Sequence, residues 1–404
     1  MKKSTVIFGL LAFGPIILLN SCSKSIESDS DLYVDPVPTP SVQLSPTASI
    51  PSLNLGQSDD TCFLDKEVAS LRAIPLETND DCLIGRISDL FIVGDTLIVI
   101  DGEKSKQIYL YGLDGQLINK FGKVGEGPGE YLTISHATVN ATGISIIDWH
   151  TARYISYDYS GNIVNTITFT SMTPSSVMQQ NDSVLVVSKE SYSQSVPFAV
   201  AWLEGDSIAD TALPYRIKRD EIEPSLFRLS STEIGVYIPT VDTIYSISGR
   251  QIEPKYKLGL ISDDEADEWR RMSARMDVIE KNKYRMSGAK MPADFIEVYP
   301  LDDYFVISHQ KVRTRYISVV DRNTLQSRNY WQSCGAPLQL FVPPYIQSAS
   351  GNTLCGYIAE DYFMRVPDES RERIERHFSE HDQEILKNYD YENNNPIVWL
   401  MELK

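Results

Sequence analysis

Several features that identify common classes of protein are missing from this sequence. It contains five cysteines (Cys22, Cys62, Cys82, Cys334 and Cys355) and no Cys-x-x-Cys pair, so a zinc site is not expected. The nucleophile elbow Gly-x-Ser-x-Gly is also absent. Lys and Arg number 37 against 55 Asp and Glu, a net charge of −18. This charge argues against nucleic acid as a partner, because its phosphates would be repelled.

Long apolar runs are scarce as well. The one at Val6–Leu19 stands alone, and after it no run reaches the ~20 residues that span a membrane. Lys2 and Lys3 precede it, and Leu19-Asn20-Ser21-Cys22 follows, which resembles a secretory signal ending in a bacterial lipobox. We therefore expect residues 1–21 to be a lipoprotein signal peptide and Cys22 to be lipidated and anchor the chain in a membrane. An ordinary signal peptide with a chance cysteine is the alternative.

The residues after Cys22 bear on the location and the form of the anchor. Ser23 stands where an Asp would resemble an inner-membrane retention signal, and the acids that follow loosely resemble the export tether of surface lipoproteins in Bacteroides-like bacteria. This predicts an outer-membrane lipoprotein exposed on the cell surface, with the periplasmic face as the alternative. Residues 22–60 are rich in Pro, Ser and Asp and poor in large apolar side chains, so we expect a disordered tether.

The four cysteines after Cys22 have two possible states, disulfide-bonded or free. An exported protein reaches an oxidising compartment, where Cys62, Cys82, Cys334 and Cys355 could form disulfides whose pairing cannot be deduced from sequence. Buried free thiols are the alternative.

A repeat is visible along the body of the chain. The segments IYLYGLDGQLINKF (108–121) and YISYDYSGNIVNTI (154–167) align without a gap, and each has a strand, a glycine turn and another strand. Weaker copies place the turn glycines at 115, 161, 205 and 249, which are 46, 44 and 44 residues apart. A period of about 40–50 residues with about four strands is typical of propeller blades.

Two further units complete the predicted fold. One has Asn323 near its turn, and the last ends in the strand 395–404 but lacks an outer strand, which residues 62–77 would supply. We thus predict an all-β, six-bladed β-propeller over residues 61–404, closed by its N-terminal strand. Residues 262–286 and 367–389 lack alternation and predict two helical insertions, with Ser262 and Glu265 forming a capping box.

These segments resemble a known family. IPLETNDDCLIG, FGKVGEGPGEY and a terminal NNNPIVWLMELK are similar to the uncharacterised six-bladed β-propeller lipoproteins of Bacteroides-like bacteria, distant relatives of NHL-repeat propellers. The resemblance covers about 62–404. It implies the fold and an envelope location, and it brings no activity and no catalytic residues.

The glycine-rich segment 123–132 is a candidate for chemistry. It holds Gly125-x-Gly127-x-Gly129, but no helix follows, so it is not a dinucleotide fingerprint. We expect it to connect one blade's outer strand to the next blade's inner strand near the ring axis. Glu126, Glu130 and Tyr131 would then line the mouth of the channel, unless they only solvate and pack the turn.

Asp148-Trp149-His150 is a second candidate for the channel mouth. The alternative is a repeat turn, because Asp101-Gly102 occupies the matching place in the first blade.

One motif suggests a metal. His377-x-x-Glu380-His381 matches the inverted zinc-protease pattern, and on a helix both histidines would share a face. The flanking charge runs instead favour a solvated helix, so we expect no metal there and no cofactor.

The sequence is most consistent with a non-catalytic binding or scaffolding propeller at the cell surface. Its ligand would be a glycan, a peptide or a partner protein. A metal-dependent lyase or lactonase with its site in the central channel is the alternative, by analogy of fold alone.

Overall fold

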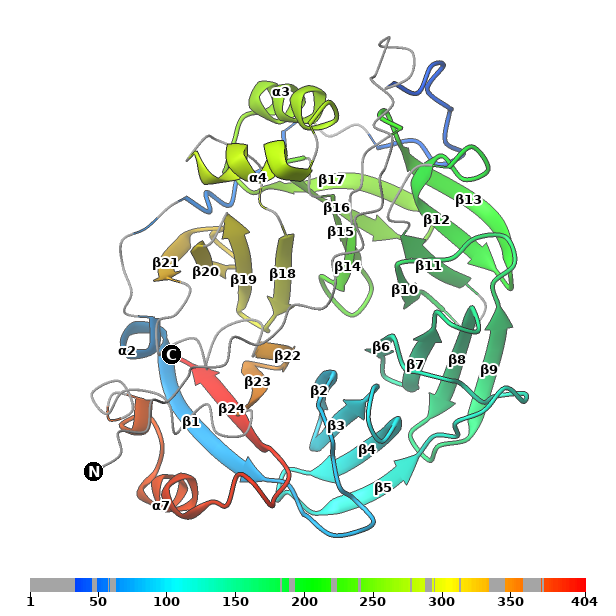
Figure 1. Ribbon diagram of the computed structural model, residues 1–404. Helices are drawn as coiled ribbons and strands as arrows, with labels where there is room; N and C mark the ends of the chain where they lie inside the picture. Colours follow the sequence, from blue (N-terminus) through cyan, green and yellow to red (C-terminus); the bar gives the residue numbers. More distant parts are fainter. Residues whose placement is uncertain are drawn as a thin grey trace, which may run out of the picture.

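The computed structural model of the protein contains six four-stranded antiparallel sheets around a common axis (Figure 1). It describes these residues: 33–45, 49–56, 58, 63–181, 184–188, 193–218, 224–238, 241–276, 278–287, 293, 295–311, 314–333, 346–358, 372 and 374–404. No helix among these residues is long and apolar enough to span a membrane.

The first three blades follow one another along the chain, each starting at its innermost strand. Blade 1 contains β2 (Asp89–Val93), β3 (Thr96–Asp101), β4 (Gln107–Gly112) and β5 (Leu117–Phe121). Blade 2 contains β6 (His136–Val139), β7 (Gly143–Asp148), β8 (Arg153–Asp158) and β9 (Ile163–Thr168). Blade 3 contains β10 (Ser176–Gln179), β11 (Val184–Ser188), β12 (Phe198–Glu204) and β13 (Ser207–Pro214).

The other three blades repeat this order, and the last one also recruits the first strand of the chain. Blade 4 contains β14 (Ser225–Arg228), β15 (Ile234–Tyr237), β16 (Thr243–Ser248) and β17 (Gln251–Lys257). Blade 5 contains β18 (Phe295–Pro300), β19 (Tyr304–Lys311), β20 (Thr314–Asp321) and β21 (Ser327–Ser333). Blade 6 contains β22 (Ile346–Ser350), β23 (Thr353–Ile358), β24 (Ile397–Leu403) and β1 (Val68–Pro75).

The predicted turn period is confirmed. In blades 1 to 4 the third strand turns into the fourth at a glycine with positive φ, from 57° at Gly249 to 88° at Gly161. At Gly115 a side chain would also collide, because an added Cβ would lie 2.1 Å from the Pro75 carbonyl oxygen of blade 6. Glycine is therefore needed there for both its φ and its small size.

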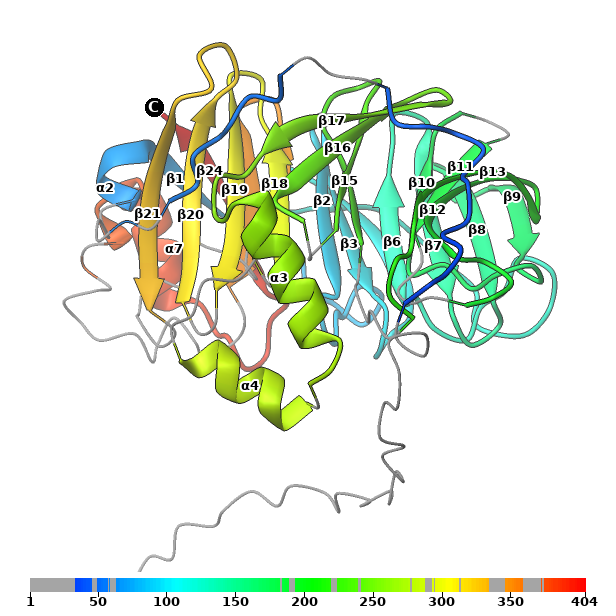
Figure 2. The ribbon, with the colours of Figure 1, turned by 90° about the horizontal axis from the view of Figure 1, so that it is seen from above.

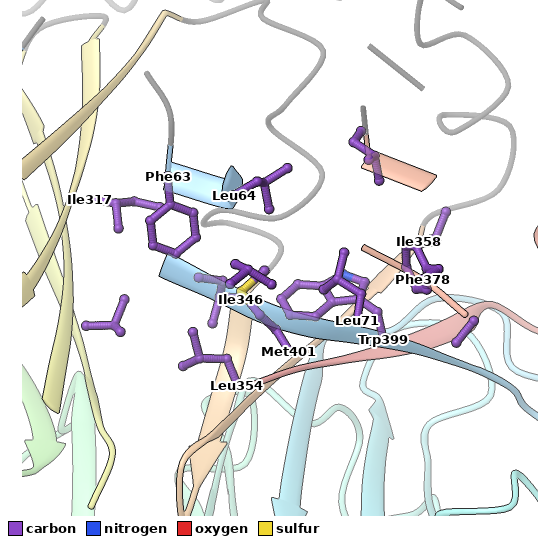
Figure 3. Packing of buried hydrophobic residues seen from close by; sticks show 14 of the residues in the cluster. Phe63, Leu64, Leu71, Ile317, Ile346, Leu354, Ile358, Phe378, Trp399 and Met401 are labelled. Carbon is purple, nitrogen blue, oxygen red and sulfur yellow. The ribbon is translucent and has the colours of Figure 1, made fainter. Parts of the chain in front are cut away.

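The predicted closure of the ring is also confirmed. β1 pairs antiparallel with β24 from Val68↔Leu403 to Pro75↔Ile397, so the two ends of the domain share one sheet. A short helix, α2 (Phe63–Glu67), leads into β1. Figure 3 shows how Phe63 and Leu71 pack with Trp399 and Met401 in this blade. The closure leaves no open edge between the first and the last blade.

The expectation of a disordered tether over 22–60 is wrong for its second half. Residues 33–45 and 49–56 run as an extended strap along the outer edges of blades 3 to 5, visible in dark blue in Figure 2. Val42 N donates to Thr211 O at 3.0 Å on β13, and Leu53 N donates to Lys257 O at 2.8 Å on β17. Leu53 and Leu55 are completely buried. The few apolar residues of the strap thus pack against the outer edges of the blades. The backbone groups at these edges, which have no partner strand within the blade, form hydrogen bonds with the strap.

The first helical insertion is confirmed as two helices, α3 (Asp263–Ser273) and α4 (Val278–Met286), which lie outside the ring (Figure 1). The Ser262–Glu265 capping box is present, with Ser262 N donating to Glu265 Oε2 at 2.8 Å. In the second insertion, α7 (Glu380–Asn388) begins after Ser379 as its N-cap. The predicted start at Pro367 lies outside the described residues.

Candidate functional site

The glycine-rich segment is the β5–β6 connection, as predicted, and the next blade holds it in shape. Arg153 at the start of β8 donates from Nη1 to Gly127 O and from Nη2 to Glu126 O, both at 2.9 Å. Glu130 accepts from Gly127 N at 2.8 Å and pairs with Lys123. The carboxylate of Glu130 therefore braces the turn, whereas the side chain of Glu126 is exposed.

Tyr131 does not line the channel mouth. Its side chain is completely buried, and its hydroxyl donates to Lys106 O at 2.8 Å. Burial raises the pKa of Tyr131 above its usual value. The residue is part of the core between blades 1 and 2, so the expectation that it lines the channel mouth is wrong and the alternative, that it packs the turn, is correct.

Asp148 also belongs to the fold. It is completely buried and accepts from Leu132 N at 2.7 Å and Thr151 Oγ1 at 2.8 Å. Burial acts to raise the pKa of Asp148, but these hydrogen bonds outweigh it and lower the pKa. Asp101 shapes the matching turn of blade 1 by accepting from Lys104 N at 2.9 Å, so for the aspartate the alternative of a repeat turn is the correct one.

The turn that Asp148 shapes presents its two neighbours to solvent. Trp149 is 47% exposed and lines the central channel. His150 is exposed, and its backbone N–H donates to Asp148 Oδ1 at 2.9 Å. Of the two predicted clusters, only Trp149 has its side chain on the channel wall.

The two histidines of the zinc-like motif do not share a helix face. His377 lies in a turn before the Ser379 cap and His381 lies in α7, so the helix starts between them. His377 Nε2 lies 3.4 Å from Asp65 Oδ1, while His381 and Glu380 are exposed. Among the described residues, no group of three or more His, Cys, Asp or Glu side chains is placed to hold a metal ion.

The cysteines in the described residues are free thiols. Cys82 and Cys355 are both buried, and Cys82 Sγ donates to Glu77 O at 3.1 Å. Burial raises the pKa of Cys355 to about 12, so this thiol stays protonated. Cys62 and Cys334 lie outside the described residues.

A cavity of about 710 Å³ lies on the ring axis. Its wall is the innermost strand of every blade, namely β2, β6, β10, β14, β18 and β22, together with Trp149 from the β7–β8 turn. The wall combines apolar side chains such as Phe91 and Met178 with hydroxyls such as Ser176 and Ser225. A volume of this size is typical of sites for small molecules.

Four ionisable side chains on this wall come from four different blades. Burial raises the pKa of Asp89 to about 7 and lowers the pKa of His136 to about 4. Burial also lowers the pKa of Arg228 and raises that of Glu297, which accepts from Tyr299 Oη at 3.1 Å. In the described part of the chain, neither Asp89, His136 nor Arg228 forms an ion pair.

The sequence analysis did not identify these four residues. The signal that could have found them is positional, because the first strand of a blade faces the axis and its polar residues must face the channel. Asp89 and His136 each open such a strand, Glu297 interrupts one, and Arg228 ends one. Alternation alone does not tell an axis-facing polar residue from a solvent-facing one.

The fold and its axial cavity define the protein as a six-bladed β-propeller with a polar, partly aromatic central channel. The chain belongs to the family described as a domain of unknown function, DUF4934, which matches residues 53–402. This match begins inside the strap, at the buried Leu53.

Two solved structures share the fold. An exported protein of Bacteroides fragilis is 17% identical, with a TM-score of 0.65, and the match covers 87% of this chain and 99% of that one. A DUF4221 family member from Bacteroides vulgatus is 10% identical, with a TM-score of 0.52, and the match covers 84% of this chain and 98% of that one. No curated protein matches the chain.

Proposed function

We propose that this protein is a non-catalytic binding protein of the bacterial cell envelope that takes a glycan or a peptide into its axial channel. The observation that carries the proposal is the channel itself, to which all six blades contribute. Its volume of about 710 Å³ suits a short ligand better than the surface of a folded partner.

The polar groups on the wall are the second support. Asp89, His136 and Arg228 make no ion pair within the described part of the chain, so they are available to a ligand. Trp149, 47% exposed at the channel wall, offers a flat apolar surface beside the hydroxyl groups. This mixture of a few polar groups and an aromatic side chain is what binding sites for small molecules commonly present.

The test is a screen of the purified protein against glycan and peptide arrays, followed by calorimetry on the hits. We expect a ligand whose binding is weakened when Ser176 on β10 is changed to Trp, which would fill part of the channel. Ser160→Trp, in the exposed β8–β9 turn on the outer side of blade 2, is the matched control. Equal affinity of both variants for the ligand would place binding elsewhere and reject the proposal.

A lyase or lactonase-type enzyme is the second candidate, and one observation favours it. A carboxyl group whose pKa lies near 7 suits general acid–base catalysis, and Asp89 on the channel wall is such a group. Metal analysis together with turnover assays on the ligands from the screen would separate the candidates. Turnover that Asp89→Asn abolishes would establish the enzyme.

We further propose that Cys22 is lipidated and anchors the protein in the outer membrane, exposed on the cell surface. Support comes from the lipobox-like sequence and from the fold shared with an exported protein. Labelling cells with radioactive palmitate should mark the protein and leave Cys22→Ala unmarked. Proteinase K added to intact cells should digest the anchored protein. Digestion only after lysis would place it on the periplasmic face instead.

A further inference from the structure

The two ends of the channel differ in their side chains. Asp89, His136 and Ser225 are the first residues of the inner strands β2, β6 and β14. Every blade repeats the same strand order, so the inner strands run in one direction along the axis. Arg228 is the last residue of β14, which at ~3.3 Å per residue places it roughly 10 Å further along the channel than Ser225.

Arg228 is a cation with little to neutralise it. Its Nη2 donates to Gln179 O at 2.6 Å, and the structure gives it no other hydrogen bond and no ion pair in the described residues. A guanidinium has five N–H donors, so most of them are left for other partners. A charge that is largely removed from water without a counter-ion is unfavourable in the free protein, and an anion beside it relieves this cost.

The acid at the other end of the channel, Asp89, does not exclude an anion beside Arg228. Burial raises the pKa of Asp89 to about 7. Asp89 is therefore about half protonated at neutral pH, and it lies at the other end of the channel from Arg228. The protonated form of Asp89 donates a hydrogen bond to a hydroxyl group, as do the serines at that end, Ser135, Ser175 and Ser225.

We propose that the channel binds a carboxylate-bearing sugar, with Arg228 as the anchor for the carboxylate. The planar fork of a guanidinium matches a carboxylate in two parallel hydrogen bonds, which makes Arg the suited residue for this group. The hydroxyl-rich end and Trp149 accommodate the remainder of the sugar. This inference rests on the proposed function and names the ligand class of the same channel.

The test compares uronate-containing oligosaccharides with their neutral counterparts and with peptides that have a free carboxyl terminus. We expect uronate-containing glycans among the hits. Calorimetry should then show a loss of roughly 30-fold or more in affinity for Arg228→Gln, the effect of removing one partner of a desolvated charge pair. Arg72→Gln is the matched control, because Arg72 likewise donates to a single backbone carbonyl, Leu113 O at 2.7 Å, but lies on the outer strand of blade 6.

A second measurement leaves the protein unchanged. The methyl ester of the same glycan should bind the native protein more weakly by a similar factor, which covers the case that Arg228→Gln fails to fold. A neutral glycan or a peptide that binds in the channel, with uronates absent from the hits, would overturn this inference and leave the proposed function standing. The absence of any ligand would overturn both.

Discussion

Glu67 and Arg328 form a two-pronged ion pair between residues 261 positions apart in the chain. Arg328 Nε and Nη2 donate to the two carboxylate oxygens of Glu67, each at 2.7 Å, and the hydroxyl of Tyr330 also donates to this carboxylate. Glu67 directly precedes β1, and Arg328 lies on β21 of blade 5. The strand that closes the ring is thus fastened to the neighbouring blade as well as to β24.

The variant Glu67→Gln tests this fastening. We expect the free energy of unfolding to fall by about 1.5–3 kcal/mol, the range for hydrogen bonds to charged groups. Glu103→Gln, which removes the exposed pair with Arg86, should change it by less than about 1 kcal/mol. Denaturation followed by circular dichroism gives both values, and equal losses would show that the Glu67–Arg328 pair has no special role.

The same variant has a defined pH dependence. Burial acts to raise the pKa of Glu67, but hydrogen bonds from Arg328 and Tyr330 outweigh it and hold the pKa below the usual 4.5. Because the folded-state pKa is lowered, the stability from this group is complete above the unfolded value and is lost as the pH falls through the folded value. The difference between the native protein and Glu67→Gln should therefore shrink below about pH 4.5.

The strap is tested by two leucines that differ in burial. Leu53→Ala removes a completely buried side chain and should cost roughly 2–5 kcal/mol of stability. Leu44→Ala, in the same strap but 45% exposed, should change stability by no more than about 0.5 kcal/mol. If thermal melts of the two variants coincide, the strap does not support the blades.

Asp89 predicts an unusual pH effect on stability. Its pKa is about 7 in the folded protein against 3.8 for an unperturbed aspartate, so the folded state holds the proton more tightly. The stability from this group is complete below about pH 4 and is lost as the pH rises to 7. The melting temperature of Asp89→Asn minus that of the native protein should therefore increase between about pH 4 and pH 7. Above pH 7 this difference should stay constant. A difference in melting temperature that does not change over this pH range would show that the pKa of Asp89 is not raised by folding.

Trp149 is expected to contribute to binding and not to folding. Trp149→Ala should weaken ligand binding at least 5-fold, as central aromatic contacts commonly do, and leave the melting temperature unchanged. His150→Ala, in the same exposed turn, is the control and should bind like the native protein. Calorimetry with the ligand from the array measures the affinity of both variants. Equal affinities of Trp149→Ala and His150→Ala would show that Trp149 does not contact the ligand.

The sequence predicted the ring because its signals are local and repeated. The glycines at 115, 161, 205 and 249 are required by the turn geometry, so their spacing reports the blades directly. The incomplete last unit and the unpaired segment 62–77 together predicted the closing strand, which is observed as β1.

The strap and the channel wall could not be predicted in this way. Leu53 and Leu55 are isolated apolar residues in a polar segment, and only the three-dimensional edges of blades 4 and 5 turn them into core. Asp89, His136 and Arg228 lie in short inner strands that the repeat pattern does not mark, and only the closed ring brings these strands around one channel. Asp148 and Tyr131 stand beside turns, where the sequence of a buried residue that shapes the turn resembles that of a functional residue.

The most direct test of the central claim is a crystal structure of the protein with a glycan from the array. We expect the glycan inside the ring of inner strands, with Trp149 beside it and a carboxylate oxygen within about 3 Å of the Arg228 guanidinium. A glycan bound on the outer strands or on the helical insertions, away from the axis, would contradict the account.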